Sequence, residues 1–188
     1  MTQLGKPIAP EIRNIRSALQ RVLKSYNIKL IDAQSVVTGK DFLMKIWRLV
    51  LSVPLGISII HEDMSSQTLS NIFFEVGMMQ AYGKETLIII SKGTRVPSDF
   101  VRTEYLEYSS NFENKLSKFL DTFVDQAAYY ESIADQLDSN PLLAIDYLRR
   151  AYLISEKDNL RTKARNIFRS AGLEGRAKNS VEMLLINF

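Results

Sequence analysis

The chain has 188 residues, of which 46% are hydrophobic and 24% are charged, and its formal net charge is +3. This composition is typical of a globular protein and excludes an intrinsically disordered one. The sequence contains no cysteine, which excludes disulfide frameworks, thiolate nucleophiles and cysteine-bound metals. No apolar run approaches the roughly 18 residues of a membrane span, and the N-terminus lacks the apolar core of a signal peptide. We therefore expect a soluble, cytoplasmic protein that does not contact a membrane.

The first sixty residues alternate between helical and extended patterns. Pro7 and Pro10 precede a helix whose apolar positions recur every three or four residues, at Ile12, Ile15, Leu19, Val22 and Leu23. Residues 28–31 then predict a short strand, and 33–40 a polar connection. Asp41 is placed to cap a second helix with apolar positions at Phe42, Leu43, Ile46, Leu49 and Val50.

Residues 55–90 predict a strand, a helix and a second strand, at 55–60, 66–82 and 86–90. Such a βαβ unit has parallel strands. A turn-rich loop at 91–97 and a short helical turn at 98–102 lead to a final strand at 103–108. Asn111 is placed to cap the next helix, whose buried side carries Leu116, Phe119, Leu120 and Phe123.

Alternation of this kind predicts an α/β fold with helices on both faces of the sheet. We expect a doubly wound, flavodoxin-like, mostly parallel sheet of four to five strands in a domain spanning residues 1–124. Residues 125–188 contain no strand-like run and predict an all-helical appendage, with helices at 127–137, 141–155, 159–170 and 178–186. Pro141 stands at a helix start and Gly172 after a helix end.

The positive charge is concentrated near the C-terminus. Residues 157–178 hold seven basic and two acidic side chains, so this segment is +5 and the remainder is −2. A basic helical segment can bind nucleic acid, but it is more often a solvated helix face. We therefore do not expect a nucleic-acid partner.

Candidate ligand-binding residues follow the predicted strands, because open α/β sheets bind ligands at the carboxyl ends of their strands. The segments that reach this edge are 32–40, 61–67, 91–96 and 109–110, together with the start of the helix at 66–82, whose free N–H groups favour an anion. The candidate binding residues among them are His61, Asp63, Ser91, Lys92 and Arg95.

Glu75 is a single carboxylate in an otherwise apolar helix, flanked by Phe73, Phe74, Val76 and two methionines. Asn71 lies one turn earlier on the same side, and Gly77 leaves room for a backbone or a ligand to approach. Desolvation by these neighbours would raise the pKa of the carboxyl, as general acid–base roles require. Spacing alone also fits an ordinary surface glutamate on a helix flank.

The residues around Glu75 follow a recognisable motif. The sequence reads Asn71-Ile72-Phe73-Phe74-Glu75-Val76-Gly77, followed by Ala81-Tyr82-Gly83-Lys84 and the strand Leu87-Ile88-Ile89-Ile90. It resembles the nucleoside 2-deoxyribosyltransferase-like superfamily and its relatives, the bacterial TIR-like nucleotide-binding domains. Residues 97–100 and 105–108 look like the end of such a domain, and the resemblance covers roughly residues 7–120.

The resemblance implies a function and roles for two residues. Glu75 would be the nucleophile, or the ion-pair partner of an oxocarbenium-like sugar, as an N-glycosidic bond is cleaved or transferred. Asn71 would hydrogen-bond the ribose or hold Glu75. The implied ligand is an NAD-type nucleotide or a deoxynucleoside, bound as substrate with no separate cofactor, and neighbouring subunits of a homo-oligomer would complete the pocket.

Two departures from the family pattern keep a second function open. Residues 1–6 are too short and polar for the strand that usually begins such domains, and the acidic residues at 61–64 have an altered spacing. The alternative is a non-catalytic nucleotide-sensing or protein-interaction module that assembles through its C-terminal helices. Glu62 and Asp63 could hold Mg²⁺ through phosphate oxygens, but the zinc motif H-E-x-x-H is absent and we expect no metal.

Overall fold

The computed structural model of the chain describes residues 9–31, 46–47, 49–50, 52–94, 105–137 and 139–186. The chain divides into two compact units, Met1–Phe119 (unit 1) and Leu120–Phe188 (unit 2). This division falls within one long helix, α4 (Phe112–Ala134), which also contains the boundary expected at residue 124.

The sheet of unit 1 is parallel and has three strands within the described residues. They are β1 (Leu55–Ile60), β2 (Glu85–Ile90) and β3 (Tyr105–Glu107), in the order β1-β2-β3. Leu55 pairs with Glu85 and Ile60 with Ile90, while Ile90 also pairs with Glu107. The α/β class and the predicted strands at 55–60 and 86–90 are therefore confirmed. The strand predicted at 103–108 is confirmed at Tyr105–Glu107, while 103–104 lie outside the described residues. The carboxyl ends of all three strands meet at one edge.

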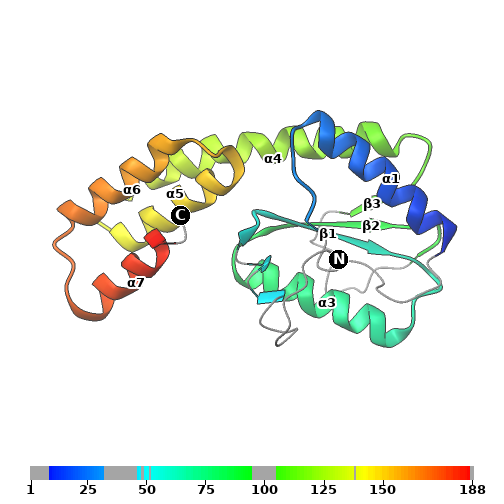
Figure 1. Cartoon of the computed structure of the whole chain (residues 1–188), viewed down its shortest axis with the longest axis horizontal. Coiled ribbons are helices and arrows are strands. Elements are labelled where there is room, and N and C mark those ends of the chain that lie inside the picture. The colour runs from blue at the N-terminus through cyan, green and yellow to red at the C-terminus, as the bar shows by residue number, and fades with distance from the viewer. Residues whose placement is uncertain are drawn as a thin grey trace. The chain divides into compact units, whose positions relative to one another are not determined.

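Helices cover both faces of this sheet. Helix α3 (Ser66–Ala81) lies on one face, and α1 (Pro10–Ser25) with the first turns of α4 lies on the other (Figure 1). On the α3 side, the amide of Gln80 donates to the hydroxyl of Thr86 at 3.1 Å. Successive side chains of a strand point to opposite faces. The even-numbered positions of β1 and β2 therefore face α3, and the odd-numbered positions face α1.

Helix α1 forms as its apolar spacing predicts. Pro10 occupies its first turn, where no amide donor is needed, and all of its predicted apolar positions are buried. Two contacts tie it to the start of α4: the Tyr26 hydroxyl donates to the Ser117 carbonyl at 3.0 Å, and Arg21 pairs with Glu113. These contacts place both helices on the same side of the sheet.

The strand expected at 28–31 is wrong, since these residues form no strand. The N–H of Ile28 instead donates to the Leu23 carbonyl at 2.9 Å and closes the C-terminus of α1, with Asn27 in the left-handed region at φ 55°. Leu30 and Ile31 remain 42% exposed, so these side chains gain little from burial. A strand at 28–31 would need the Ile28 N–H for hydrogen bonds to a neighbouring strand, but this N–H already caps α1.

Helix α3 carries the chain from β1 back to the start of β2. The Ser65 side chain accepts a hydrogen bond from the Thr68 N–H, which caps its N-terminus. Its inner side packs on the sheet, and Met78 and Met79 also contact Ile46 and Val50, which lie within the predicted second helix. Four predicted features lie outside the described residues: the segment 32–40, the cap at Asp41, the helix start at 42–45 and the turn at 98–102.

Helix α4 is continuous where two helices were expected. The sequence suggested one helix near 112–123 and another at 127–137, but Phe112–Ala134 forms a single helix. Its buried positions recur every three or four residues through the expected break, at Phe112, Leu116, Leu120, Phe123 and Ala127. Because no glycine or proline interrupts residues 112–134, the helix has no reason to end.

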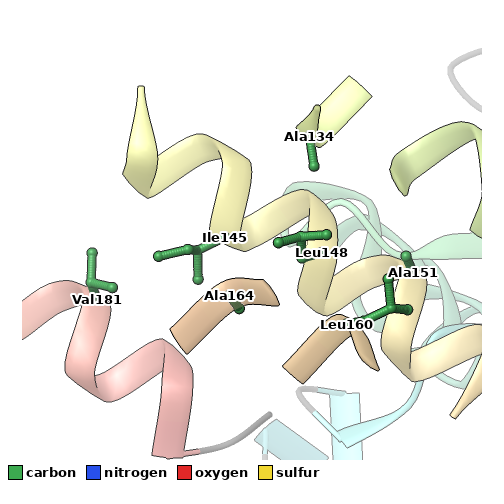
Figure 2. Packing of buried hydrophobic residues seen from close by; sticks show 7 residues of the cluster. All are labelled: Ala134, Ile145, Leu148, Ala151, Leu160, Ala164 and Val181. Atoms are coloured by element: carbon green, nitrogen blue, oxygen red, sulfur yellow. The ribbon is translucent and has the colours of Figure 1, made fainter. Parts of the chain in front are cut away.

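Unit 2 is helical throughout its described residues, as expected. It contains the end of α4, α5 (Pro141–Ser155), α6 (Asp158–Ser170) and α7 (Gly175–Ile186). The Asn140 side chain caps α5 by accepting the Leu143 N–H at 3.2 Å. Small and branched side chains interdigitate in its core (Figure 2), which comprises Ala134, Ile145, Leu148, Ala151, Leu160, Ala164 and Val181.

Gly77 differs from the other glycines in ways that predict its mutational behaviour. It lies inside α3, and a Cβ built on it meets no atom within 4 Å, so the close approach expected at this position is not present. Gly77→Ala should therefore raise the free energy of unfolding of unit 1 by about 0.5–1 kcal/mol, because alanine has less conformational freedom to lose. Urea unfolding followed by the fluorescence of Trp47, the single tryptophan, measures this change.

Gly93→Ala is the matched control for this substitution. Its Cβ would also meet no atom within 4 Å, but its φ is +82°. The left-handed conformation should make the same added methyl group destabilising by about 1 kcal/mol. Destabilisation by Gly77→Ala would contradict the open environment described for that position.

Candidate functional site

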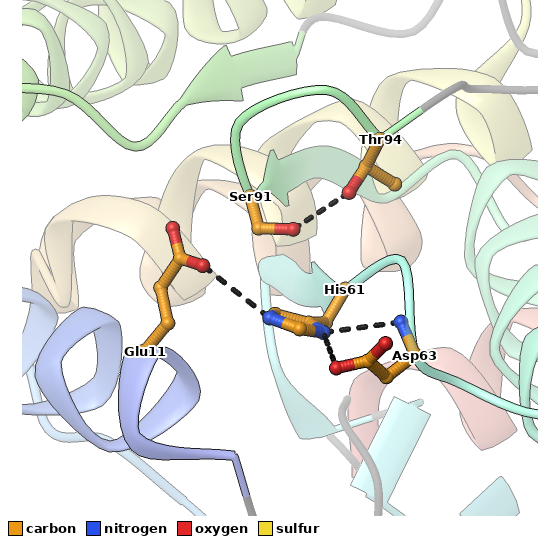
Figure 3. A network of polar contacts seen from close by, with 5 residues as sticks. All are labelled: Glu11, His61, Asp63, Ser91 and Thr94. Atoms are coloured by element: carbon orange, nitrogen blue, oxygen red, sulfur yellow. Dashed lines mark hydrogen bonds and ion pairs between the residues drawn. The ribbon is translucent and has the colours of Figure 1, made fainter.

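His61 lies one residue past the end of β1 and is buried. It continues the odd-numbered face and therefore points toward α1. Its Nε2 lies 3.3 Å from Oε2 of Glu11 in the first turn of α1, and its Nδ1 accepts the backbone N–H of Asp63 at 3.1 Å (Figure 3). The ring thus joins the start of α1 to the loop that leads into α3.

These contacts assign the proton of the neutral imidazole. A ring nitrogen that accepts a hydrogen bond carries no proton, so the proton sits on Nε2, facing Glu11. Oδ2 of Asp63 lies 3.5 Å from Nδ1 and would accept a hydrogen bond from that nitrogen if the ring were protonated. His61 is therefore placed between two carboxylates, one on each side of the ring.

The residues that follow β2 occupy the neighbouring position of the same edge. The pairing register continues to Ser91, whose N–H donates to the Ile60 carbonyl at 3.0 Å, so Ser91 stands beside His61. Its buried hydroxyl lies 2.6 Å from that of Thr94 (Figure 3). Lys92 is exposed on the turn between these two residues, whereas Arg95 lies outside the described residues.

Glu75 lies on the other side of the sheet, in α3. Because β1 and β2 are parallel, α3 must run back across the sheet from the carboxyl edge. At 1.5 Å per residue, Glu75 is about 15 Å from the Ser65 cap and thus opposite the middle of the strands rather than at their ends. Its side chain is half-buried, and it makes no hydrogen bond or ion pair with another described residue.

Burial raises the pKa of the Glu75 carboxyl above its ordinary value, as its apolar neighbours predict. The folded state therefore holds this proton at pH values where the unfolded chain has released it. Stability contributed by the protonated carboxyl is present below the unfolded pKa and falls as the pH rises toward the folded pKa. Burial makes the charged form of this carboxyl unfavourable. A nearby positive charge therefore stabilises the Glu75 carboxylate more than it would stabilise an exposed one.

Two other polar groups on the α3 side bear on this environment. Asn71 is exposed, and its side-chain oxygen accepts from the Gln67 amide at 3.1 Å, so it is not engaged with Glu75. Ser58, in the middle of β1, is fully buried on the face covered by α3, and its hydroxyl has no hydrogen-bond partner among the described residues. An unpaired buried hydroxyl is unfavourable by roughly 1–3 kcal/mol.

The predicted site residues thus separate into two groups. The first group lies at the carboxyl edge and consists of His61, Asp63, Ser91 and Lys92. His61 contacts Asp63 directly, and Ser91 bonds to Ile60, the residue before His61. Asn71 and Glu75 lie along α3, on the opposite face from His61. Sequence reasoning missed Glu11 and Ser58, whereas Thr94 lies in the predicted ligand-binding segment 91–96. Ser58 could have been found as the lone hydroxyl in the apolar run 55–60, whereas Glu11 has no local signal because its partner is 50 residues away.

The described residues contain no group of three or more histidine, aspartate or glutamate side chains placed to hold a metal ion. Glu62 and Asp63 are exposed on the turn after β1. Within the same described segments, no helix combines the length and apolar character needed to cross a membrane.

Comparisons of the chain with protein-family models, with curated proteins and with solved structures find no match. The assignment of a function therefore rests on the chemistry of the residues described above.

The His61 contacts predict a graded loss of stability. His61→Ala removes the acceptor for the Asp63 N–H and the donor to Glu11, and should lower the free energy of unfolding by about 1–3 kcal/mol. His61→Asn should lose less, because its amide oxygen can accept the Asp63 N–H. Trp47 fluorescence in urea measures both variants, and equal stability of His61→Ala and the unsubstituted protein would contradict the contacts.

Proposed function

We propose that unit 1 binds a nucleotide or nucleoside and cleaves or transfers its N-glycosidic bond, with Glu75 as the reacting carboxylate. The observation that carries this proposal is the half-buried carboxyl of Glu75, whose pKa is raised by burial and which forms no hydrogen bond or ion pair with another described residue. A carboxylate that burial disfavours gains when a ligand brings positive charge close to it. It is also strongly stabilised by positive charge at the anomeric carbon.

The proposed chemistry requires one carboxylate and a leaving base. The bond between the anomeric carbon and the base nitrogen breaks, and the base departs with the bonding electron pair. The resulting oxocarbenium-like sugar is stabilised by a Glu75 oxygen, either as an ion pair or through an ester bond to the anomeric carbon. Water or a second base then attacks that carbon and releases Glu75, which gives hydrolysis or transfer respectively.

The remaining candidate residues have supporting roles in this proposal. Asn71, one turn nearer the start of α3, would contact the ribose with the part of its amide that Gln67 does not occupy. Ser91 and the exposed Lys92 would face the phosphates, together with Arg95. His61 and Asp63 would shape the edge of the sheet at which the ligand enters. Ser58 adds an unsatisfied hydroxyl on the same face as Glu75.

The proposal carries three broader expectations. The fold would be the doubly wound, flavodoxin-like type with four to five strands, of which three are described. The ligand would be an NAD-type nucleotide or a deoxynucleoside, consumed as substrate with no other cofactor. The protein would act as a cytoplasmic homo-oligomer.

A second candidate function is a non-catalytic nucleotide-sensing or protein-interaction module. Unit 2 favours it, because this unit is helical throughout its described residues and has a hydrophobic core of its own. In this case unit 1 would bind a nucleotide without cleaving it, and unit 2 would mediate assembly.

Release of free base separates the two candidates. The full chain is incubated with NAD and with a panel of ribo- and deoxynucleosides, and free base is followed by chromatography. Glu75→Gln should reduce the rate of base release by at least about 100-fold, since the amide cannot supply the negative charge. Glu62→Gln, at an exposed carboxylate of the same unit, should retain the activity.

Two outcomes would contradict the catalytic proposal. Base release that persists in Glu75→Gln would remove Glu75 from the reaction. Ligand-dependent stabilisation of the protein without base release from any substrate would favour the sensing module instead.

A further inference from the structure

One side of α3 carries five side chains in the order Asn71, Glu75, Met78, Met79 and Tyr82. They follow one another at spacings of three or four residues, with the two methionines in one turn, so they are neighbours along this side of the helix. Asn71 is nearest the carboxyl edge of the sheet, and Tyr82, the C-cap residue, is nearest the opposite edge. A ligand along this side would therefore meet an amide, a carboxyl and an aromatic ring in turn.

The second half of this side is apolar. Met78 and Met79 are buried in a hydrophobic cluster with residues 46 and 50, and Trp47 packs against that cluster. The segment that contains Trp47 therefore lies beside the C-terminal half of α3. Glu75 precedes Met78 by one turn, so its carboxyl adjoins the apolar cluster.

Trp47 and Tyr82 form an aromatic pair at the end of this side. Their ring centroids are 5.3 Å apart and their planes make an angle of 77°, which is an edge-to-face contact. Such a contact fixes the angle between two rings and covers at most one face of either ring. Trp47 is half-buried, whereas Tyr82 is 41% exposed. Trp47 thus orients an aromatic ring that remains accessible to solvent.

The spacing between Glu75 and Tyr82 suits one part of a nucleoside. Seven residues at 1.5 Å each place their Cα atoms about 10 Å apart along the helix. Helical side chains lean toward the N-terminus, so the Tyr82 ring extends back toward Glu75 and shortens this interval. In a nucleoside the planar base is bonded directly to the anomeric carbon. A base that lies against Tyr82 therefore brings its anomeric carbon toward the Glu75 carboxyl.

We propose that Trp47 and Tyr82 form the subsite for the base of the ligand, which stacks on the Tyr82 ring while its anomeric carbon faces Glu75. This inference rests on the proposed function, because it assigns the part of the ligand that lies beyond Glu75. Stacking on an aromatic side chain tolerates every base. The larger ring system of a purine covers more apolar surface than a pyrimidine does. The ligand class is therefore a nucleoside or nucleotide with an aromatic base, and purines bind more tightly.

Fluorescence of the full chain tests the subsite directly, because Trp47 is the single tryptophan and belongs to it. Adenosine, cytidine and ribose are each titrated to about 1 mM, and free tryptophan in the same solutions corrects for light absorbed by the bases. Adenosine should quench Trp47 in a saturable manner, and cytidine should bind more weakly. Ribose should leave the fluorescence unchanged, because it has no ring to stack.

Two substitutions at Tyr82 separate stacking from general apolar packing. Tyr82→Phe keeps the ring and should keep the affinity for adenosine within about twofold. Tyr82→Leu keeps an apolar side chain without a ring and should weaken adenosine binding at least about tenfold. Tyr105→Leu is the matched control, because Tyr105 is a tyrosine of the same unit, 52% exposed on β3, and its loss should leave binding unchanged. Urea unfolding of each variant shows that it is folded.

Two further measurements separate the subsite from catalysis. Glu75→Gln should still show quenching by adenosine, because stacking does not require the carboxylate. In the base-release assay, Tyr82→Leu should raise KM at least about tenfold and change kcat much less, as expected for a contact made equally in the ground state and the transition state. Absence of base release from every substrate would contradict the proposed function, and the quenching by adenosine would still decide the subsite.

Three results would overturn the subsite. Adenosine could fail to quench Trp47 in a saturable manner, or ribose could quench it equally. Alternatively, a folded Tyr82→Leu variant could bind adenosine as tightly as the unsubstituted chain does. That last result would show that the base lies elsewhere, even if Glu75 cleaves the bond.

Discussion

The parallel pairing of β1 with β2 is the constraint on which the arrangement of unit 1 depends. The register from Leu55–Glu85 to Ile60–Ile90 decides which side chains face α3 and which face α1. Ser58 is thereby buried beneath α3, the helix that carries Glu75, and His61 is turned toward Glu11 on the opposite face. A slip of one residue would exchange the two faces and place His61 beneath α3. The register therefore fixes the polar environment on both sides of the sheet.

Much of the fold could be predicted because its longest segments have a clear period. The apolar spacing of residues 12–23 and the βαβ pattern of residues 55–90 each have one regular solution, and the structure adopts it. The failures occur where a local competitor decides the outcome. The Ile28 N–H closes α1 instead of extending a strand, and α4 continues through residues 124–127 because its burial pattern does not break. Hydrophobic periodicity alone does not show which of two such local structures is the more stable.

The candidate site was predictable only where its chemistry is local. Burial raises the pKa of Glu75, and the apolar residues beside it in the sequence predict such an environment. The contact between Glu11 and His61 depends instead on how α1 packs against the end of β1, and no pattern in either segment indicates it. The separation of Asn71 and Glu75 from the carboxyl edge likewise depends on the direction of α3 across the sheet. Tertiary packing therefore decides which of the predicted residues can act together.

The central claim is that Glu75 is a desolvated carboxylate available to a ligand. Carbon-13 NMR titration of protein labelled at the glutamate side-chain carboxyls tests it most directly, with Glu75→Gln used to assign the signal. We predict that the Glu75 carboxyl titrates above the ordinary range of glutamate, as burial requires, and that a bound nucleotide or nucleoside shifts this titration. A Glu75 signal that titrates in the ordinary range and does not respond to ligand would contradict the account.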